Sequence, residues 1–107
     1  MTALHEQHCQ SYSGTTPLHA DSLAEPLLQL NNWQPSGTQI SKAFRFKDYY
    51  QTIAFINAVA FIAQQQDHHP DISFGYNSCT ISFTTHSIGG LSMNDFICAA
   101  RIDHLNI

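Results

Sequence analysis

The chain has 107 residues, which is enough for one hydrophobic core and too few for two, so we expect a single domain. Charged residues make up 11% of it, less than half of the roughly 25% that is usual for soluble domains. The formal net charge is −4, and the few Lys and Arg residues cannot form the basic stripe that direct nucleic-acid binding requires. No apolar run reaches the length of a membrane span, and no signal-peptide pattern opens the chain.

The cysteines and histidines indicate which kinds of site the chain can contain. The three cysteines, Cys9, Cys79 and Cys98, are odd in number and widely spaced, which fits neither a disulfide framework nor a zinc knuckle. We therefore expect a reducing, cytoplasmic location. The chain also contains seven histidines, whose charge can change near neutral pH, so catalytic residues are sought among them.

The first segment, residues 1–20, mixes Ser, Thr, Gln and His with Gly14 and Pro17 and shows no period. It predicts a loose N-terminal arm, followed by one domain over residues 21–107. Next, Ser22 and Glu25 fit a capping box, and leucines at helical spacing predict a short amphipathic helix (Leu23, Leu27 and Leu30).

A hairpin is predicted after this helix. Residues 33–34 open one strand, residues 35–37 turn, and residues 40–47 alternate with Phe44 and Phe46 on one face.

A long helix is predicted over residues 49–66, where neither Gly nor Pro interrupts the chain and Asp48 with Gln51 forms a cap pair. Residues 53–63 are apolar on every side except at Asn57. A helix of this kind needs cover on more than one face, so we expect one face on the sheet and another on a partner subunit.

Pro70 ends the helix, and residues 72–77 and 80–86 predict two further strands. Ser92 and Asp95 form another capping box, which opens a last helix. The predicted fold is therefore α+β, with two layers: a four-stranded antiparallel sheet and three helices on one face, in the order α-β-β-α-β-β-α.

Three histidines and one aspartate are the candidate catalytic residues. His68 and His69 are adjacent in an extended segment, so their side chains point to different sides and should have different roles. The following strands can bring His86 back beside them, and the last helix can bring Asp95 to the same end of the sheet. Such imidazoles can donate one proton and accept another near pH 7, as elimination of water requires.

Other interpretations compete with this one. Capping explains Asp95 about as well as catalysis does, and both can hold, while Asp67 and Asp71 fit solvated turn residues. A three-histidine zinc site is the competing chemical interpretation. However, an adjacent His-His pair before Pro lacks the helical i, i+4 spacing of zinc-binding histidines, and we expect no metal.

The motifs resemble the pterin-4a-carbinolamine dehydratase family over about residues 23–105. They are Asp67-His68-His69-Pro70, Tyr76-Asn77, Thr85-His86, Gly90-Leu91-Ser92, Asp95, Trp33 and the run from Phe55 to Ala60. The start of the chain, with His8-Cys9, is similar to a bacterial branch found alongside phenylalanine hydroxylase.

The resemblance implies a hydro-lyase that converts 4a-hydroxytetrahydrobiopterin to quinonoid dihydropterin and so recycles the cofactor of aromatic amino acid hydroxylases. By similarity, His68 and His86 are the acid and base, His69 holds the pterin, and Asp95 orients an imidazole. Substrate-binding candidates are His69, Pro70, Tyr76, Asn77 and Thr85. The resemblance implies no metal or redox cofactor, and it implies a homodimer or homotetramer formed through the 49–66 helix.

The chain departs from the family pattern at Gln64, Ile72 and Asn94. The first two changes weaken pterin-edge or stacking contacts. Two alternatives stay open at this stage: a non-catalytic dimerisation or transcriptional-cofactor-like module that binds through residues 53–63, and a related enzyme that acts on another pterin.

Overall fold

The computed structural model describes residues 2–105, so Met1 of the predicted arm and the last two residues of the predicted domain lie outside the described residues. The regular elements are η1 (Leu4–Glu6), η2 (Ala20–Ser22), α1 (Ala24–Leu28), β1 (Gln34–Ser36), β2 (Gln39–Arg45), α2 (Tyr49–Gln66), β3 (Asp71–Phe74), β4 (Ser78–Phe83), η3 (His86–Ile88) and α3 (Met93–Asp103).

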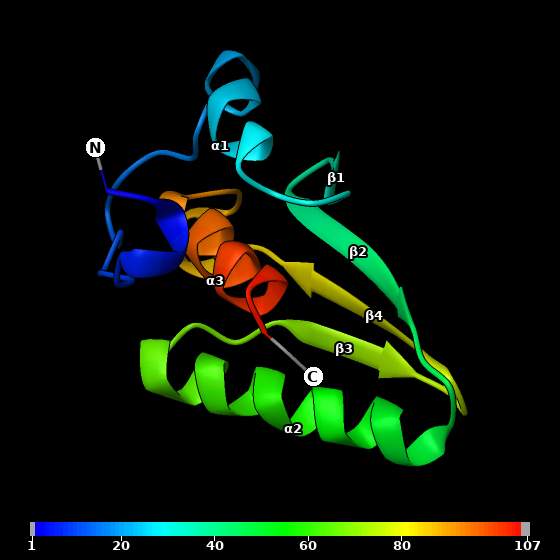
Figure 1. The fold of residues 1–107 in the computed structure, drawn as a ribbon. Coiled ribbons are helices and arrows are strands. Elements are labelled where there is room, and N and C mark those ends of the chain that lie inside the picture. Colours follow the sequence, from blue (N-terminus) through cyan, green and yellow to red (C-terminus); the bar gives the residue numbers. More distant parts are fainter. Residues whose placement is uncertain (1, 106–107) are drawn as a thin grey trace.

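The strands form one antiparallel sheet in the order β1-β2-β4-β3. Helices α2 and α3 pack against each other over one face of this sheet, while α1 lies near β1 (Figure 1). Gly37, with φ of 61°, supplies the left-handed residue in the short turn between β1 and β2. The predicted α+β class, the element order and the presence of the first hairpin are confirmed, but Pro35 and Ser36, which were predicted in the turn, lie in β1.

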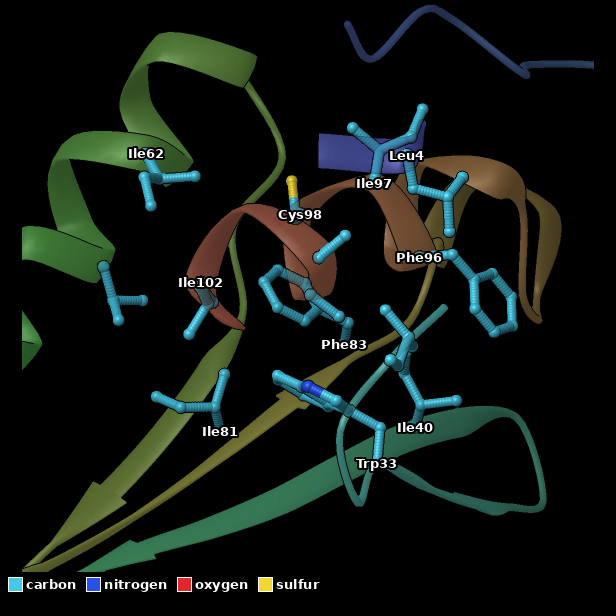
Figure 2. Close-up of a cluster of buried hydrophobic side chains, with 14 of the residues drawn as sticks. Leu4, Trp33, Ile40, Ile62, Ile81, Phe83, Phe96, Ile97, Cys98 and Ile102 are labelled. Atoms are coloured by element: carbon cyan, nitrogen blue, oxygen red, sulfur yellow. The ribbon is translucent and has the colours of Figure 1, made fainter. Parts of the chain in front are cut away.

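The core lies between the central strand β4 and the two long helices. Alternate β4 residues are buried, and Ile81 and Phe83 are 0% and 1% exposed. They contact the same apolar cluster as Val59 of α2 and Phe96 of α3, and Figure 2 shows the α3 side chains standing over the strand residues. Each such side chain contributes about 2–3 kcal/mol on burial, so this alternation fixes which face of the sheet receives the helices.

Helix α2 has the bounds that the sequence predicted. The Asp48 carboxylate accepts a hydrogen bond from the Gln51 N–H at 2.9 Å, and Asp67 ends the helix in the left-handed region with φ of 52°. One face, which includes Phe55 and Val59, is buried on the sheet. None of the helices within residues 2–105 has the length and apolar character needed to span a bilayer.

Two local predictions were wrong. The box of Ser22 and Glu25 does not form, because residues 20–22 already make a tight 3₁₀ turn and Ser22 cannot adopt the extended cap conformation. Strand β4 also stops at Phe83 and does not reach His86, which lies in η3. The backbone turns there, because Thr85 and Gly90 exchange hydrogen bonds across a short loop.

The N-terminal segment packs against the domain, in contrast to the loose arm that the sequence indicated. Leu4 is 2% exposed and belongs to the main core, and η1 lies along α3. The Arg101 guanidinium donates to the Gln7 carbonyl, and the Leu4 N–H donates to Gln29 Oε1 at 3.1 Å. These partners are distant in the sequence, so local composition could not indicate them.

The Asp103 side chain connects the last turn of α3 to the rest of the fold through hydrogen bonds. Its Oδ1 accepts from Trp33 Nε1 at 3.0 Å and from Lys42 Nζ at 2.9 Å, while Oδ2 accepts from the Asn31 N–H at 2.9 Å. The Asp103 side chain is only 2% exposed. One carboxylate thus connects α3 to β2 and to the segment between α1 and β1.

We predict that Asp103→Ala lowers the free energy of unfolding by about 2–3 kcal/mol, because the buried Trp33 and the half-buried Lys42 lose the acceptor for their N–H groups. Chemical denaturation measures this change. Asp71→Ala, at an exposed carboxylate on β3, is the control and should stay within about 0.5 kcal/mol of wild type. Equal losses in both variants would contradict the role given to Asp103.

Candidate functional site

A cleft of about 330 Å³ opens where the end of α2, the start of α3, η3 and the N-terminal segment meet. These elements contribute its walls, which are formed by Cys9, Gln10, Ser11, Tyr12, Gln66, Asp67, His68, Thr85, Ser87 and Asn94. The lining is mainly polar, and His68 is its only imidazole among the described residues. The cleft has the size expected for one small ligand.

A hydrogen-bonded pair of His68 and Asp95 lies at this cleft. His68 Nε2 is 2.6 Å from Asp95 Oδ1, and Asp95 is 0% exposed. Asp95 Oδ2 accepts from Thr85 Oγ1 at 2.8 Å and from the Ser92 N–H at 3.0 Å. Asp95 therefore caps α3 and also hydrogen-bonds His68, so the confirmed capping role does not exclude the predicted orienting role.

The His68 imidazole is held on one face by Phe83 and at one edge by Asp95. The left-handed Asp67 turns the chain out of α2, and the ring stacks on Phe83 with centroids 5.8 Å apart. Because a carboxylate accepts only, Nε2 carries the hydrogen and Nδ1 remains for proton exchange. Burial lowers the pKa of His68, but the hydrogen bond and charge of Asp95 outweigh it and raise that pKa above 6.5.

The other two predicted histidines are placed differently. His69 is exposed, and its Nε2 lies 3.3 Å from Gln64 Oε1 on the last turn of α2. His86 is exposed in η3, between Thr85 and Ser87, both of which line the cleft. The structure thus brings His68, Asp95 and Thr85 together and leaves both other imidazoles off the cleft lining.

Tyr76 and Asn77 lie at the opposite end of the sheet. The Tyr76 carbonyl accepts from Thr52 Oγ1 in the first turn of α2, and the Asn77 carbonyl accepts from the Phe46 N–H. His68 lies just beyond the other end of α2, a helix of 18 residues that is about 27 Å long at 1.5 Å per residue. Within one chain, the structure therefore does not bring these two predicted substrate-binding residues to the cleft, because strand β3 carries them away from His68. Pro70 is half-buried and lies outside the cleft lining.

Sequence reasoning missed the contribution of the N-terminal segment, residues 9–12. Asn94 holds it, because Oδ1 accepts from the Gln10 N–H at 3.0 Å and Nδ2 donates to the Gln10 carbonyl at 2.6 Å. Gln66 Oε1 accepts from the Cys9 N–H at 2.8 Å. Two local signals fall in this region, the departure from the family pattern at Asn94 and the His8-Cys9 motif, but neither indicates that the two segments contact each other.

Within residues 2–105, no three His, Cys, Asp or Glu side chains lie close enough together to bind a metal ion.

The family model for pterin 4 alpha carbinolamine dehydratase matches residues 16–105. The chain belongs to this family. A relative from Nitrosospira multiformis that is named after pterin-4-alpha-carbinolamine dehydratase is 52% identical over 92% of this chain and 88% of its own length. A similarly named protein from Nitrosomonas eutropha is 54% identical over 88% of this chain and 84% of its own. The predicted family, and with it a dehydratase of the hydro-lyase class, is confirmed.

Solved structures agree with this family. The transcriptional coactivator/pterin dehydratase from Brucella melitensis has a TM-score of 0.77 and 29% identity, over 81% of this chain and 95% of its own. A pterin dehydratase-like protein described as a RuBisCO assembly factor in the α-carboxysome has a TM-score of 0.56 and 28% identity, over 69% and 86%. The dehydratase family model begins after the cleft-lining residues 9–12.

We predict that the NMR titration of His68 has a midpoint above 6.5 in the wild type and a lower one in Asp95→Asn. The amide keeps the size of the side chain but removes the charge that favours the imidazolium. Since the folded pKa is raised, the pair stabilises the protein fully below pH 6.5 and loses this contribution as pH rises through the folded pKa. The melting-temperature gap between wild type and Asp95→Asn should therefore narrow at high pH. An unchanged His68 midpoint in the variant would contradict the assignment.

Proposed function

We propose that the chain dehydrates pterin-4a-carbinolamine to quinonoid dihydropterin in the cleft at His68. The observation that carries this proposal is the 2.6 Å pair of His68 with the fully buried Asp95, in a chain of the dehydratase family. The carbon–oxygen bond at C4a breaks, the hydroxyl leaves with an added proton as water, and N5 loses its proton as the N5–C4a double bond forms. No electrons are gained or lost overall, so the reaction needs no redox cofactor.

His68 is suited to protonate the departing hydroxyl. Its raised pKa increases the fraction of imidazolium at neutral pH, and Nδ1 is the nitrogen not engaged by Asp95. After the proton leaves, the neutral ring keeps its orientation, because Asp95 still accepts from Nε2. General acid catalysis of this kind contributes about 10²- to 10⁴-fold to a rate.

His86 is the proposed partner that takes the N5 proton. It lies between two residues that line the cleft, and its exposed ring can exchange that proton with water. His69, beside His68 in the chain, would hold the edge of the pterin, and the Thr85 hydroxyl lies at the cleft wall. These roles follow the family resemblance, as does a functional link to an aromatic amino acid hydroxylase whose pterin is recycled.

We predict that His68→Ala and His86→Ala each lower kcat by about 10²-fold or more, because each removes one proton-transfer group. The assay follows dehydration of chemically generated 4a-hydroxytetrahydropterin above the buffer rate. His19→Ala, at an exposed histidine outside the cleft, is the control and should retain wild-type activity. Wild-type kcat should fall as pH rises through the His68 pKa. A wild-type rate equal to buffer would overturn the proposed reaction.

A second function, self-association, is favoured by the outer face of α2. Tyr50 and Phe61 are 81% and 68% exposed, and Tyr49, Phe74 and Tyr76 add exposed aromatic surface near the start of the helix. Monomeric proteins rarely expose so many large apolar side chains together. We propose that α2 forms the interface of a homodimer or homotetramer. The same surface is the one that a non-catalytic binding module would use.

We predict that light scattering at micromolar concentration gives the mass of an oligomer and that Phe61→Asp lowers that mass, because a charge in an apolar interface is costly. Leu28→Asp, at another exposed apolar residue but on α1, is the control and should assemble like wild type. His68→Ala should also assemble normally. A monomeric wild type would contradict the interface, whereas an inactive but assembled wild type would favour the binding module.

A further inference from the structure

Two cysteines from opposite ends of the chain meet beside the cleft. Cys9 Sγ lies 3.5 Å from Cys98 Sγ. Cys9 is half-buried and lines the cleft, while Cys98 is 0% exposed on α3, one turn after Asp95. The third cysteine, Cys79, is buried on β4. The mechanism proposed above uses neither member of the Cys9–Cys98 pair.

The contact between the two sulfurs is held by the surrounding hydrogen bonds. The Cys9 N–H donates to Gln66 Oε1 at 2.8 Å. The Asn94 side chain accepts from the N–H of the next residue, Gln10, and donates to the Gln10 carbonyl. Helices α2 and α3 therefore both fix the backbone that carries Cys9. A disulfide has sulfurs about 2.05 Å apart, so bond formation requires a closure of about 1.5 Å.

The two thiols differ in reactivity. The hydrogen bond with Cys98, together with the nearby charges of His68 and Arg101, lowers the pKa of the Cys9 thiol despite its partial burial. The contact with Cys9 and burial raise the pKa of Cys98. Because the thiolate is the nucleophile, Cys9 is the sulfur that reacts first with an oxidant entering the cleft.

We propose that Cys9 and Cys98 form an oxidation-sensitive dithiol, which hydroperoxides convert into a disulfide between the N-terminal segment and α3. The Cys9 thiolate attacks one peroxide oxygen and the O–O bond breaks, so that Cys9 becomes a sulfenic acid. The departing alkoxide or hydroxide takes up the proton that the Cys9 thiol had released and leaves as alcohol or water. Cys98 sulfur then attacks the Cys9 sulfur, its proton joins the departing hydroxide, and water is released as the S–S bond forms.

The disulfide would link residues 9–12, which line the cleft, covalently to α3, the helix that carries Asp95. It would also close a loop from residue 9 to residue 98, almost the whole chain, and long loops restrict the unfolded state most strongly. The inference does not rest on the proposed dehydratase reaction, because its readouts are covalent mass and thermal stability.

The test treats the reduced, folded full-length protein with a small excess of hydrogen peroxide and maps the products by mass spectrometry. We expect loss of two hydrogen atoms, a Cys9–Cys98 cross-linked peptide and full reversal by dithiothreitol. The oxidised form should melt at least about 5 °C higher than the reduced form. Cys79→Ser is the matched control and should show the same cross-link and the same rise in melting temperature on oxidation, although its buried hydroxyl lowers the melting temperature of both forms.

Variants of the pair separate this inference from unspecific oxidation. In Cys98→Ser, the Cys9 sulfenic acid should persist and react with dimedone, because its resolving thiol is gone. In Cys9→Ser, Cys98 should stay reduced at the same peroxide dose. The inference is overturned if wild-type Cys9 accumulates as a dimedone-reactive or over-oxidised product while Cys98 remains a free thiol, or if cross-links involve Cys79.

Discussion

The buried carboxylate of Asp95 is the interaction on which the site depends. It accepts from the first turn of α3 through Ser92, from Thr85 in the connection after β4, and from His68 just beyond α2. A buried carboxylate without such donors would cost several kcal/mol, so the three segments are constrained to meet at one point. The same hydrogen bond from His68 that helps to satisfy the buried carboxylate also orients the His68 ring and raises its pKa. Packing and proposed catalysis thus share one group.

The cleft around this pair is completed by a segment far away in the chain. Gln66 and Asn94, on the two helices that carry His68 and Asp95, hold the backbone of residues 9–10 through side-chain hydrogen bonds. Each bond is modest alone, at about 1 kcal/mol, but Leu4 in the core adds an apolar anchor. Residues 9–12 can therefore keep a fixed conformation at the cleft without forming a helix or strand. A disulfide between Cys9 and Cys98, as proposed above, would attach this segment to α3 covalently.

Periodic and capped elements could be predicted from the sequence because their determinants are local. The uninterrupted run after Asp48 gave α2 with its exact bounds, and Ser92 with Asp95 gave the start of α3. Alternation at Ile81 and Phe83 gave the inward face of β4. The capping box of the first helix was predicted wrongly, because a 3₁₀ turn competes with the cap at Ser22 and both conformations are compatible with the same residues.

The sequence by itself determined the α+β order and the family, and it placed His68 and Asp95 among the candidate site residues, since these follow from local periodicity and a specific motif. Only the tertiary structure decided which histidine faces the cleft, because the turn at Thr85 and Gly90 takes His86 out of the strand. It also decided that Tyr76 lies beside the first turn of α2, at the far end of that helix from His68, and that Cys9 contacts Cys98. Such placements depend on contacts between distant segments, which no local pattern encodes.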